Sequence, residues 1–224
     1  SKVEVRTIPQ LQGAEKEAKG ISDLFVANKW TNVLLTEKLA DEDKLKNMEG
    51  PRILHVATHG YFQPDKTSSM AYDDNSVLKK NELSPLFRSG ILLTGAGELL
   101  DNHFTAGNVN GQTGILTAYE AMNMNLDNTE LVTLSACETG LGDVQIGEGV
   151  AGLQRSFLVA GAENVVMSLF KVDDEVTEKL MLTFYEKWLR SGDKRRSFIE
   201  AKKEIKADFP ESVYWGSFIM IGVN

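Results

Sequence analysis

Three apolar runs of strand length constrain the fold of this chain more than any other feature of its sequence. They are RILHVATHGYF at residues 52–62, TELVTLSAC at 129–137 and NVVMSLFKV at 164–172. Continuous apolar character is typical of strands that are covered on both faces of a sheet, because neither side of such a strand meets water. Segments with helical periodicity lie between the runs. The sequence therefore predicts an α/β fold with a mostly parallel sheet and helices on both of its faces.

The remaining elements are predicted from local periodicity and from the positions of turn residues. The expected helices span residues 11–25, 39–48, 115–126, 148–162, 173–192 and 194–209. The expected shorter strands span residues 32–35, 89–99 and 213–223. Residues 63–82 and 101–114 are polar and turn-rich and have no periodicity, so we expect them to be loops.

Charge and length exclude some classes of protein. The 224 residues carry 24 Lys and Arg against 32 Asp and Glu, a formal charge of −8, which argues against nucleic acid as the main ligand. A basic stretch at 187–206 also contains Asp193, Glu200 and Glu204, so we interpret it as a solvated helix face. The length fits one large domain that covers residues 1–224.

The single cysteine excludes an intrachain disulfide and a zinc site built from several cysteines. Residues 1–25 show no secretory signal pattern, and no apolar run approaches the roughly 18 residues of a membrane span. We therefore expect a cytoplasmic protein in a reducing compartment, with no membrane partner.

Cys137 and His59 each stand at the end of a predicted buried strand. Ligands of α/β sheets collect at the carboxyl ends of the strands, so this is where chemistry is expected. His59 could accept the thiol proton of Cys137 and later protonate a leaving amine, while the amides of Gly60 and Cys137 could hold an oxyanion. Each residue alone has a plainer interpretation. A lone cysteine is more often a small buried apolar residue, and a lone histidine is more often a loop residue with a satisfied hydrogen bond.

Two other patterns miss the spacing that their chemistry needs. HVATH at 55–59 has two histidines four residues apart, but a zinc peptidase needs them on a helix, with a glutamate after the first. We interpret His55 as a core residue with one hydrogen bond. The glycines at 140, 142 and 147 miss the G-x-G-x-x-G spacing of a dinucleotide loop. The sequence thus predicts neither a metal nor any other cofactor.

Four sequence blocks together resemble one family, the CHAT domain, in the expected order over nearly the whole chain. The blocks are HVATHGYF (55–62), LVTLSACETGLGD (131–143), GEGVAGLQRSFLVAGAENVVMSLFKVDDEVT (147–177) and YWGSFIMIG (214–222). The resemblance implies a caspase-like peptidase, related to caspases, separases, gingipains and legumains, on a three-layer α/β/α sandwich. It also implies that His59 is the dyad histidine, that Cys137 is the nucleophile, and that the Gly60 amide joins the oxyanion hole.

The same resemblance bears on substrate preference. In separases a segment similar to KVDDE (171–175) contributes an acid to the pocket for the residue before the cut. This suggests Asp174, or else Asp173, as a substrate-binding residue that selects Arg or Lys, with Glu138 adding negative potential beside the nucleophile. The alternative is structural, because acids in a first helical turn are favoured by the helix dipole and Asp173 is a good N-cap.

A preference for substrate Asp would instead need inward-facing basic residues, for which Arg88 and Lys171 are the nearest candidates. The resemblance further implies a cysteine endopeptidase that cuts a protein substrate as a regulated effector in bacterial defence or signalling. CHAT domains are often attached to tetratricopeptide repeats, so we expect the chain to be excised from a longer protein and to respond to such a sensor region, N-terminal or separate. The loops at 63–82 and 101–114 are expected to be mobile until activation.

Two alternatives remain open at this point. The chain could be a catalytically silent protein-binding module of the same fold. It could also use the same thioester chemistry to transfer an acyl group to an amine other than water.

Overall fold

The computed structural model describes residues 11–62, 84–96, 113–138, 148–169 and 173–223. In this part of the chain, six strands form one sheet in the order β3-β2-β1-β4-β5-β6. The strands are β1 (Ile53–Phe62), β2 (Ser89–Leu92), β3 (Ile115–Thr117), β4 (Leu131–Glu138), β5 (Asn164–Ser168) and β6 (Phe218–Gly222). The loop predicted at 63–82 and residues 101–112 of the loop predicted at 101–114 lie outside the described residues.

The three apolar runs of the sequence form the centre of the sheet as β1, β4 and β5, which confirms their prediction as buried strands. These three strands are parallel to one another, whereas β2, β3 and β6 each join the sheet by an antiparallel pairing. The sheet is therefore mixed and partly parallel, so the expected parallel arrangement holds for the three central strands and not for the pairings at either side. Edge strands can join a sheet in either direction, and the apolar pattern of a single strand does not reveal which.

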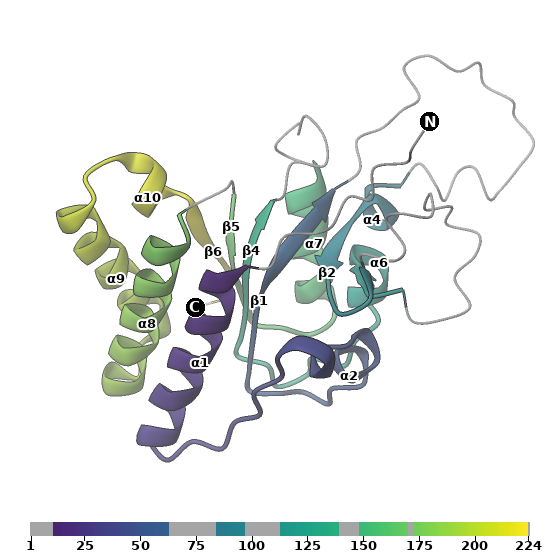
Figure 1. Ribbon diagram of the computed structural model, residues 1–224, viewed down its shortest axis with the longest axis horizontal. Coiled ribbons are helices and arrows are strands. Elements are labelled where there is room, and N and C mark those ends of the chain that lie inside the picture. The colour runs from purple at the N-terminus through teal and green to yellow at the C-terminus, as the bar shows by residue number, and fades with distance from the viewer. Residues whose placement is uncertain (1–10, 63–83, 97–112, 139–147, 170–172, 224) are drawn as a thin grey trace, which may run out of the picture.

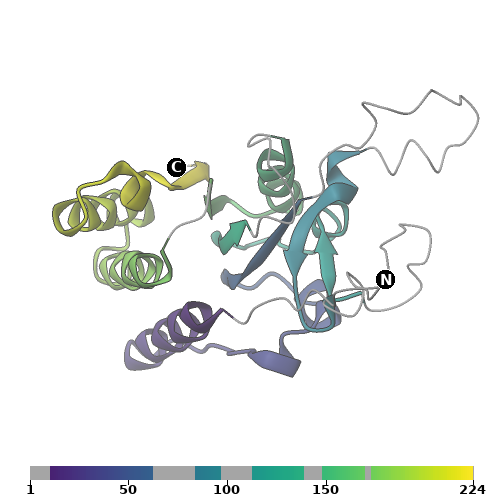
Figure 2. The same cartoon turned by 45° about the horizontal axis from the view of Figure 1, so that its top comes forward.

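Helices lie on both faces of the sheet (Figures 1 and 2). One face carries α1 (Gln12–Ala27), α8 (Asp174–Ser191) and α9 (Lys194–Asp208). The other carries α4 (Pro85–Arg88), α6 (Ala118–Ala121) and α7 (Glu148–Val159). The short elements η1 (Glu37–Leu39), α2 (Glu42–Lys46) and α10 (Ser212–Gly216) complete the described structure.

Strand alternation divides the apolar side chains between two cores. On β4, Val132 and Leu134 join the core beneath α7, while Leu131 joins the core beneath α1 and α8. On β5, Val165 and Val166 divide in the same way. Successive side chains point to opposite faces of a strand, so each central strand supplies both cores, and this explains its continuous apolar sequence.

Four predicted elements differ from the structure, because local periodicity alone does not fix where an element begins, ends or pairs. Residues 115–126 were expected to be one helix, but the first three form β3, and α6 begins only after Thr117, which caps it. Residues 213–223 divide into α10 and β6 instead of forming one strand. Residues 32–35 are described but form no strand, and the helix expected at 39–48 shortens to α2 behind its N-cap Asp41.

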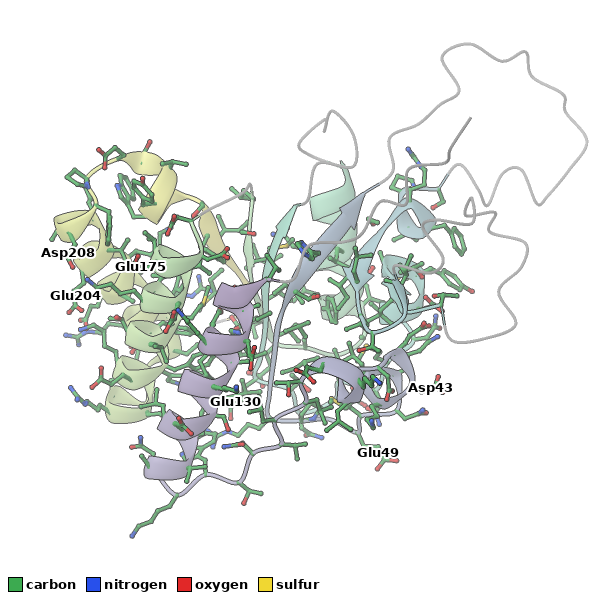
Figure 3. All side chains as sticks on the ribbon, viewed as in Figure 1. Asp43, Glu49, Glu130, Glu175, Glu204 and Asp208 are labelled. Atoms are coloured by element: carbon green, nitrogen blue, oxygen red, sulfur yellow. The ribbon has the colours of Figure 1, made fainter. Side chains whose placement is uncertain are left out.

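The acidic side chains labelled in Figure 3 lie on different elements of the described structure. Asp43 and Glu49 lie in and near α2, while Glu204 and Asp208 lie on α9, at the other side of the molecule. The two α9 acids pair with lysines of α8, and Arg196 pairs with Glu200 within α9 at 2.9 Å. The basic stretch at 187–206 is therefore a solvated, ion-paired helix face, as the sequence predicted. No helix among the described residues is long and apolar enough to cross a membrane.

Candidate active site

The two candidate catalytic residues lie on neighbouring parallel strands at the same register position. The backbone of His59 on β1 is paired with that of Cys137 on β4, and Gly60 is paired with Glu138. Paired strands run about 4.8 Å apart, so two positions that are 78 residues apart in sequence (137 − 59) become immediate neighbours. For Cys137 and Glu138 the structure describes the backbone only.

His59 is 6% exposed. The sequence predicted His59 at the end of its strand, and this expectation is wrong. β1 continues to Phe62, and its last three residues pair with β2, Gly60 opposite Ile91. His59 therefore lies within the sheet, and alternation along β1 puts it on the same face as His55, the face covered by α1 and α8.

Gly60 has strand neighbours on both sides, because it pairs with β4 through Glu138 and with β2 through Ile91. The Gly60 amide can donate a hydrogen bond to an oxyanion only if it donates none to β2 or β4 within the sheet. The oxyanion hole formed by Gly60 and Cys137 stays a prediction.

A buried polar cluster lies on the same face of the two strands, below the candidate dyad. His55 Nδ1 lies 3.1 Å from the phenolic oxygen of Tyr185, and that oxygen lies 2.8 Å from Thr133 Oγ1. Burial raises the pKa of the Tyr185 phenol above its usual value, and the nearby Glu17 carboxylate adds to the rise. The interpretation of His55 as a core residue with a hydrogen-bond partner is confirmed.

Sequence reasoning missed Glu17, the acid of this cluster. It is 3% exposed, with Oε2 accepting a hydrogen bond of 2.9 Å from Ser135 Oγ and Oε1 lying 2.9 Å from His55 Nε2. A signal was present in the sequence, since Glu17, Ile21 and Phe25 follow one another at helical spacing and the last two are core residues. An acid on the apolar face of a helix indicates a buried partner.

The predicted specificity acids lie at the start of α8, which follows β5 at the same edge of the sheet as the candidate dyad. Asp173 is the N-cap of α8, and its side chain accepts hydrogen bonds from the amides of Glu175 and Val176 at 3.0 and 3.2 Å. Asp174 is exposed and packs against the first turn of α1, where a Cβ added to Gly13 would lie 2.4 Å from the Asp174 Cβ. The structure brings neither acid into a described contact with His59.

Of the two basic candidates, Arg88 is buried at the end of α4, directly before β2, and Lys171 lies outside the described residues. The described residues contain no group of three or more His, Cys, Asp or Glu side chains that could hold a metal ion.

Helices cover both faces of the sheet, and a histidine and a cysteine stand at paired backbone positions on two central strands, as the resemblance to a caspase-like protein predicts. The family model of the CHAT domain matches residues 2–223. The chain therefore belongs to the CHAT domain family, which confirms the resemblance seen in the sequence.

Two relatives are proteins with tetratricopeptide repeats by name. The chain is 24% identical to human Tetratricopeptide repeat protein 28 over 217 residues, which cover 95% of the chain and 8% of that protein. It is 30% identical to the mouse protein of the same name over 110 residues, which cover 48% of the chain and 4% of that protein. The chain thus spans less than a tenth of the length of either relative.

Proposed function

We propose that this protein is a cysteine endopeptidase that uses Cys137 and His59 as a catalytic dyad. The observation that carries the proposal is the register of β1 and β4, in which the two residues are direct neighbours in the carboxyl-terminal half of the two strands. Membership of the CHAT domain family, which is caspase-like, supports it, and the resemblance of the sequence blocks implies that His59 and Cys137 are the dyad.

The proposed reaction proceeds through a thioester. His59 takes the proton of the Cys137 thiol, and the thiolate attacks the scissile carbonyl carbon. The amides of Gly60 and Cys137 stabilise the negative oxygen of the tetrahedral intermediate. His59 then gives its proton to the leaving amine, and the C–N bond breaks. A water molecule hydrolyses the acyl-enzyme, which releases the new carboxyl terminus and returns the thiol.

The test is cleavage of a peptide library by the parent protein and by Cys137→Ala and His59→Ala. General acid–base catalysis typically contributes about 100-fold or more, so His59→Ala should lower cleavage by at least that factor, and Cys137→Ala should abolish it. Glu15→Gln, an exposed position on α1, is the matched control and should cleave at the parent rate. A variant of either dyad residue that cleaves as fast as the parent would overturn the proposal.

We further propose that the enzyme prefers Arg or Lys before the cut. The support is the acidic group at the edge of the sheet, Asp173 and Asp174 after β5 and Glu138 at the end of β4. The same library measures this preference, and Asp174→Asn should weaken cleavage after Arg and Lys more than cleavage after apolar residues. Buried Arg88 motivates the opposite outcome, a preference for Asp, which would contradict the basic-residue proposal.

One observation favours a second candidate function, a protein-binding module that does not cleave. Gly60 is flanked by β4 and β2, so its amide is enclosed within the sheet. A thiol-reactive peptidyl probe distinguishes the two functions, since an endopeptidase should label at Cys137 and a silent module should not.

The proposed biological role is that of a regulated effector in bacterial defence or signalling, joined to or controlled by a sensor region such as tetratricopeptide repeats. The names of the two relatives support the association with such repeats. Adding a candidate sensor protein to the cleavage assay tests it, because the rate should change only when the two are present together.

A further inference from the structure

Glu17 is a carboxylate that α1 carries into the interior of the protein. The neighbouring acid Glu15 is exposed and pairs with Lys19 on the same helix, whereas Glu17 is 3% exposed and faces the sheet. A buried carboxylate is costly unless polar groups of the protein replace water around it. The polar groups that contact the Glu17 carboxylate therefore indicate its role in the structure.

Those partners come from both strands of the candidate dyad. Glu17 Oε2 accepts a 2.9 Å hydrogen bond from Ser135 Oγ of β4. Glu17 Oε1 lies 2.9 Å from His55 Nε2 of β1, within ion-pair distance, although the two atoms are not aligned for a hydrogen bond. One carboxylate thus joins the two central strands to each other and to α1.

The contacts stand close to the dyad in the sheet. Ser135 is two residues before Cys137 on β4, and His55 is four residues before His59 on β1. Alternation places the members of each pair on the same face, with Ser135 about 6.6 Å along the strand from Cys137. A shift of the Glu17 carboxylate therefore acts on the strand positions directly below the reacting residues.

We propose that Glu17 is a positioning residue for the dyad. The inference rests on the proposed function, since it concerns the same cysteine and histidine. α1 packs against α8 and β1, and Glu17 is its polar link to β4. Loss of the Glu17 carboxylate removes its contacts with Ser135 and His55 and changes the alignment of Cys137 with His59.

The experiment uses the fact that Cys137 is the only cysteine in the sequence. Its alkylation by iodoacetamide at pH 7 therefore reports a single site and needs no peptide substrate. A thiol aligned with a histidine reacts faster than an isolated one, because more of it is thiolate. We expect Glu17→Ala to lower the alkylation rate constant of the folded protein by roughly tenfold. Ser135→Ala should lower it in the same direction, and Glu15→Gln should leave it unchanged.

Glu17→Gln is the conservative variant, and it separates a positioning role from a structural one. Its amide oxygen can still accept from Ser135 Oγ, so the rate should return to within about threefold of the parent. Rates are compared for proteins whose circular dichroism shows the native fold. If Glu17→Ala does not fold, Ser135→Ala decides the matter, and a parental rate there overturns the proposal. The proposal is also overturned if Glu17→Ala lowers the free energy of unfolding but leaves the alkylation rate unchanged. It is overturned as well if Glu17→Gln reacts as slowly as Glu17→Ala.

His59→Ala keeps this inference separate from the proposed function. If His59→Ala slows alkylation and the Glu17 and Ser135 variants do not, the dyad stands and the positioning role fails. If His59→Ala leaves the rate unchanged, the dyad itself fails.

Discussion

Tyr185 offers the sharpest stability test of the buried cluster beneath the candidate dyad. Its side chain has no exposed surface, and its hydroxyl lies 2.8 Å from Thr133 Oγ1 and 3.1 Å from His55 Nδ1. Tyr185→Phe removes the hydroxyl and leaves two buried polar atoms without that partner. Each such atom costs roughly 1–3 kcal/mol, and partial relaxation lowers the sum, so we expect a loss of about 2 kcal/mol in unfolding free energy at pH 7.

The pH dependence of this loss is also predicted. Burial raises the pKa of the Tyr185 phenol, so above about pH 10 the unfolded chain releases this proton while the folded protein keeps it. The contribution to stability is fully present below about pH 10 and falls as pH rises further, by about 1.4 kcal/mol at pH 11. Tyr185→Phe has no proton to lose, so the gap between parent and variant should shrink from about 2 to below about 1 kcal/mol.

The assay is urea unfolding under reducing conditions at pH 7, 9, 10 and 11, followed by tryptophan fluorescence. Titration of the lysines affects parent and variant equally and cancels in the difference. Tyr119→Phe is the matched control, because Tyr119 is 47% exposed on α6 and should change stability by less than about 0.5 kcal/mol at every pH. A gap that stays constant from pH 7 to 11, or a Tyr185→Phe protein as stable as the parent, would refute the reasoning.

Three further stability predictions concern loops and helix starts, and each is checked by urea unfolding. Glu42 is 1% exposed and accepts three hydrogen bonds from the residues just before β3, so Glu42→Ala should cost about 3 kcal/mol, against less than about 0.5 for the exposed Glu49→Ala. Gly114→Ala and Gly192→Ala both place alanine at a positive φ, +68 and +73, but only at Gly114 would the new Cβ meet a backbone nitrogen, 2.2 Å away. Gly192→Ala should therefore cost about 1 kcal/mol and Gly114→Ala clearly more, and equal losses would contradict the steric argument. Asp173→Ala should cost about 1 kcal/mol through loss of the α8 cap, and an unchanged stability would show that the two amide contacts contribute nothing.

The central strands could be predicted from the sequence because their apolar character is local. β4 and β5 are buried on both faces, whereas β1 is buried on the α7 face and mostly half-buried on the other, and a largely apolar run is sufficient to indicate a central strand. The edge of the sheet was harder to predict, since β3 has only three residues and leads directly into α6, so its pairing with β2 leaves no separate periodic signal. The direction of β6 depends in the same way on its antiparallel partner, which is distant in sequence.

In the candidate site, too, the sequence predicts what depends on local pattern and misses what depends on contacts between distant segments. The sequence predicted His59 and Cys137 as site residues from their places near strand ends. Their shared register depends on the pairing of β1 with β4, which neither segment encodes alone. Glu17 lies one helical turn before the core residue Ile21, so its buried position could be predicted from periodicity. Its contact with Ser135 could not be predicted, because the two residues are 118 positions apart.

The most direct test of the dyad is the pH dependence of Cys137 alkylation from pH 5 to 9 in the parent and in His59→Ala. An isolated thiol reacts appreciably only as the pH approaches the thiol pKa of about 8.5. We predict that the parent reacts at least roughly tenfold faster than His59→Ala at pH 6 to 7, and that the two rates converge as pH approaches 9. Profiles that coincide over the whole range would show that His59 does not activate Cys137, which would contradict the central claim.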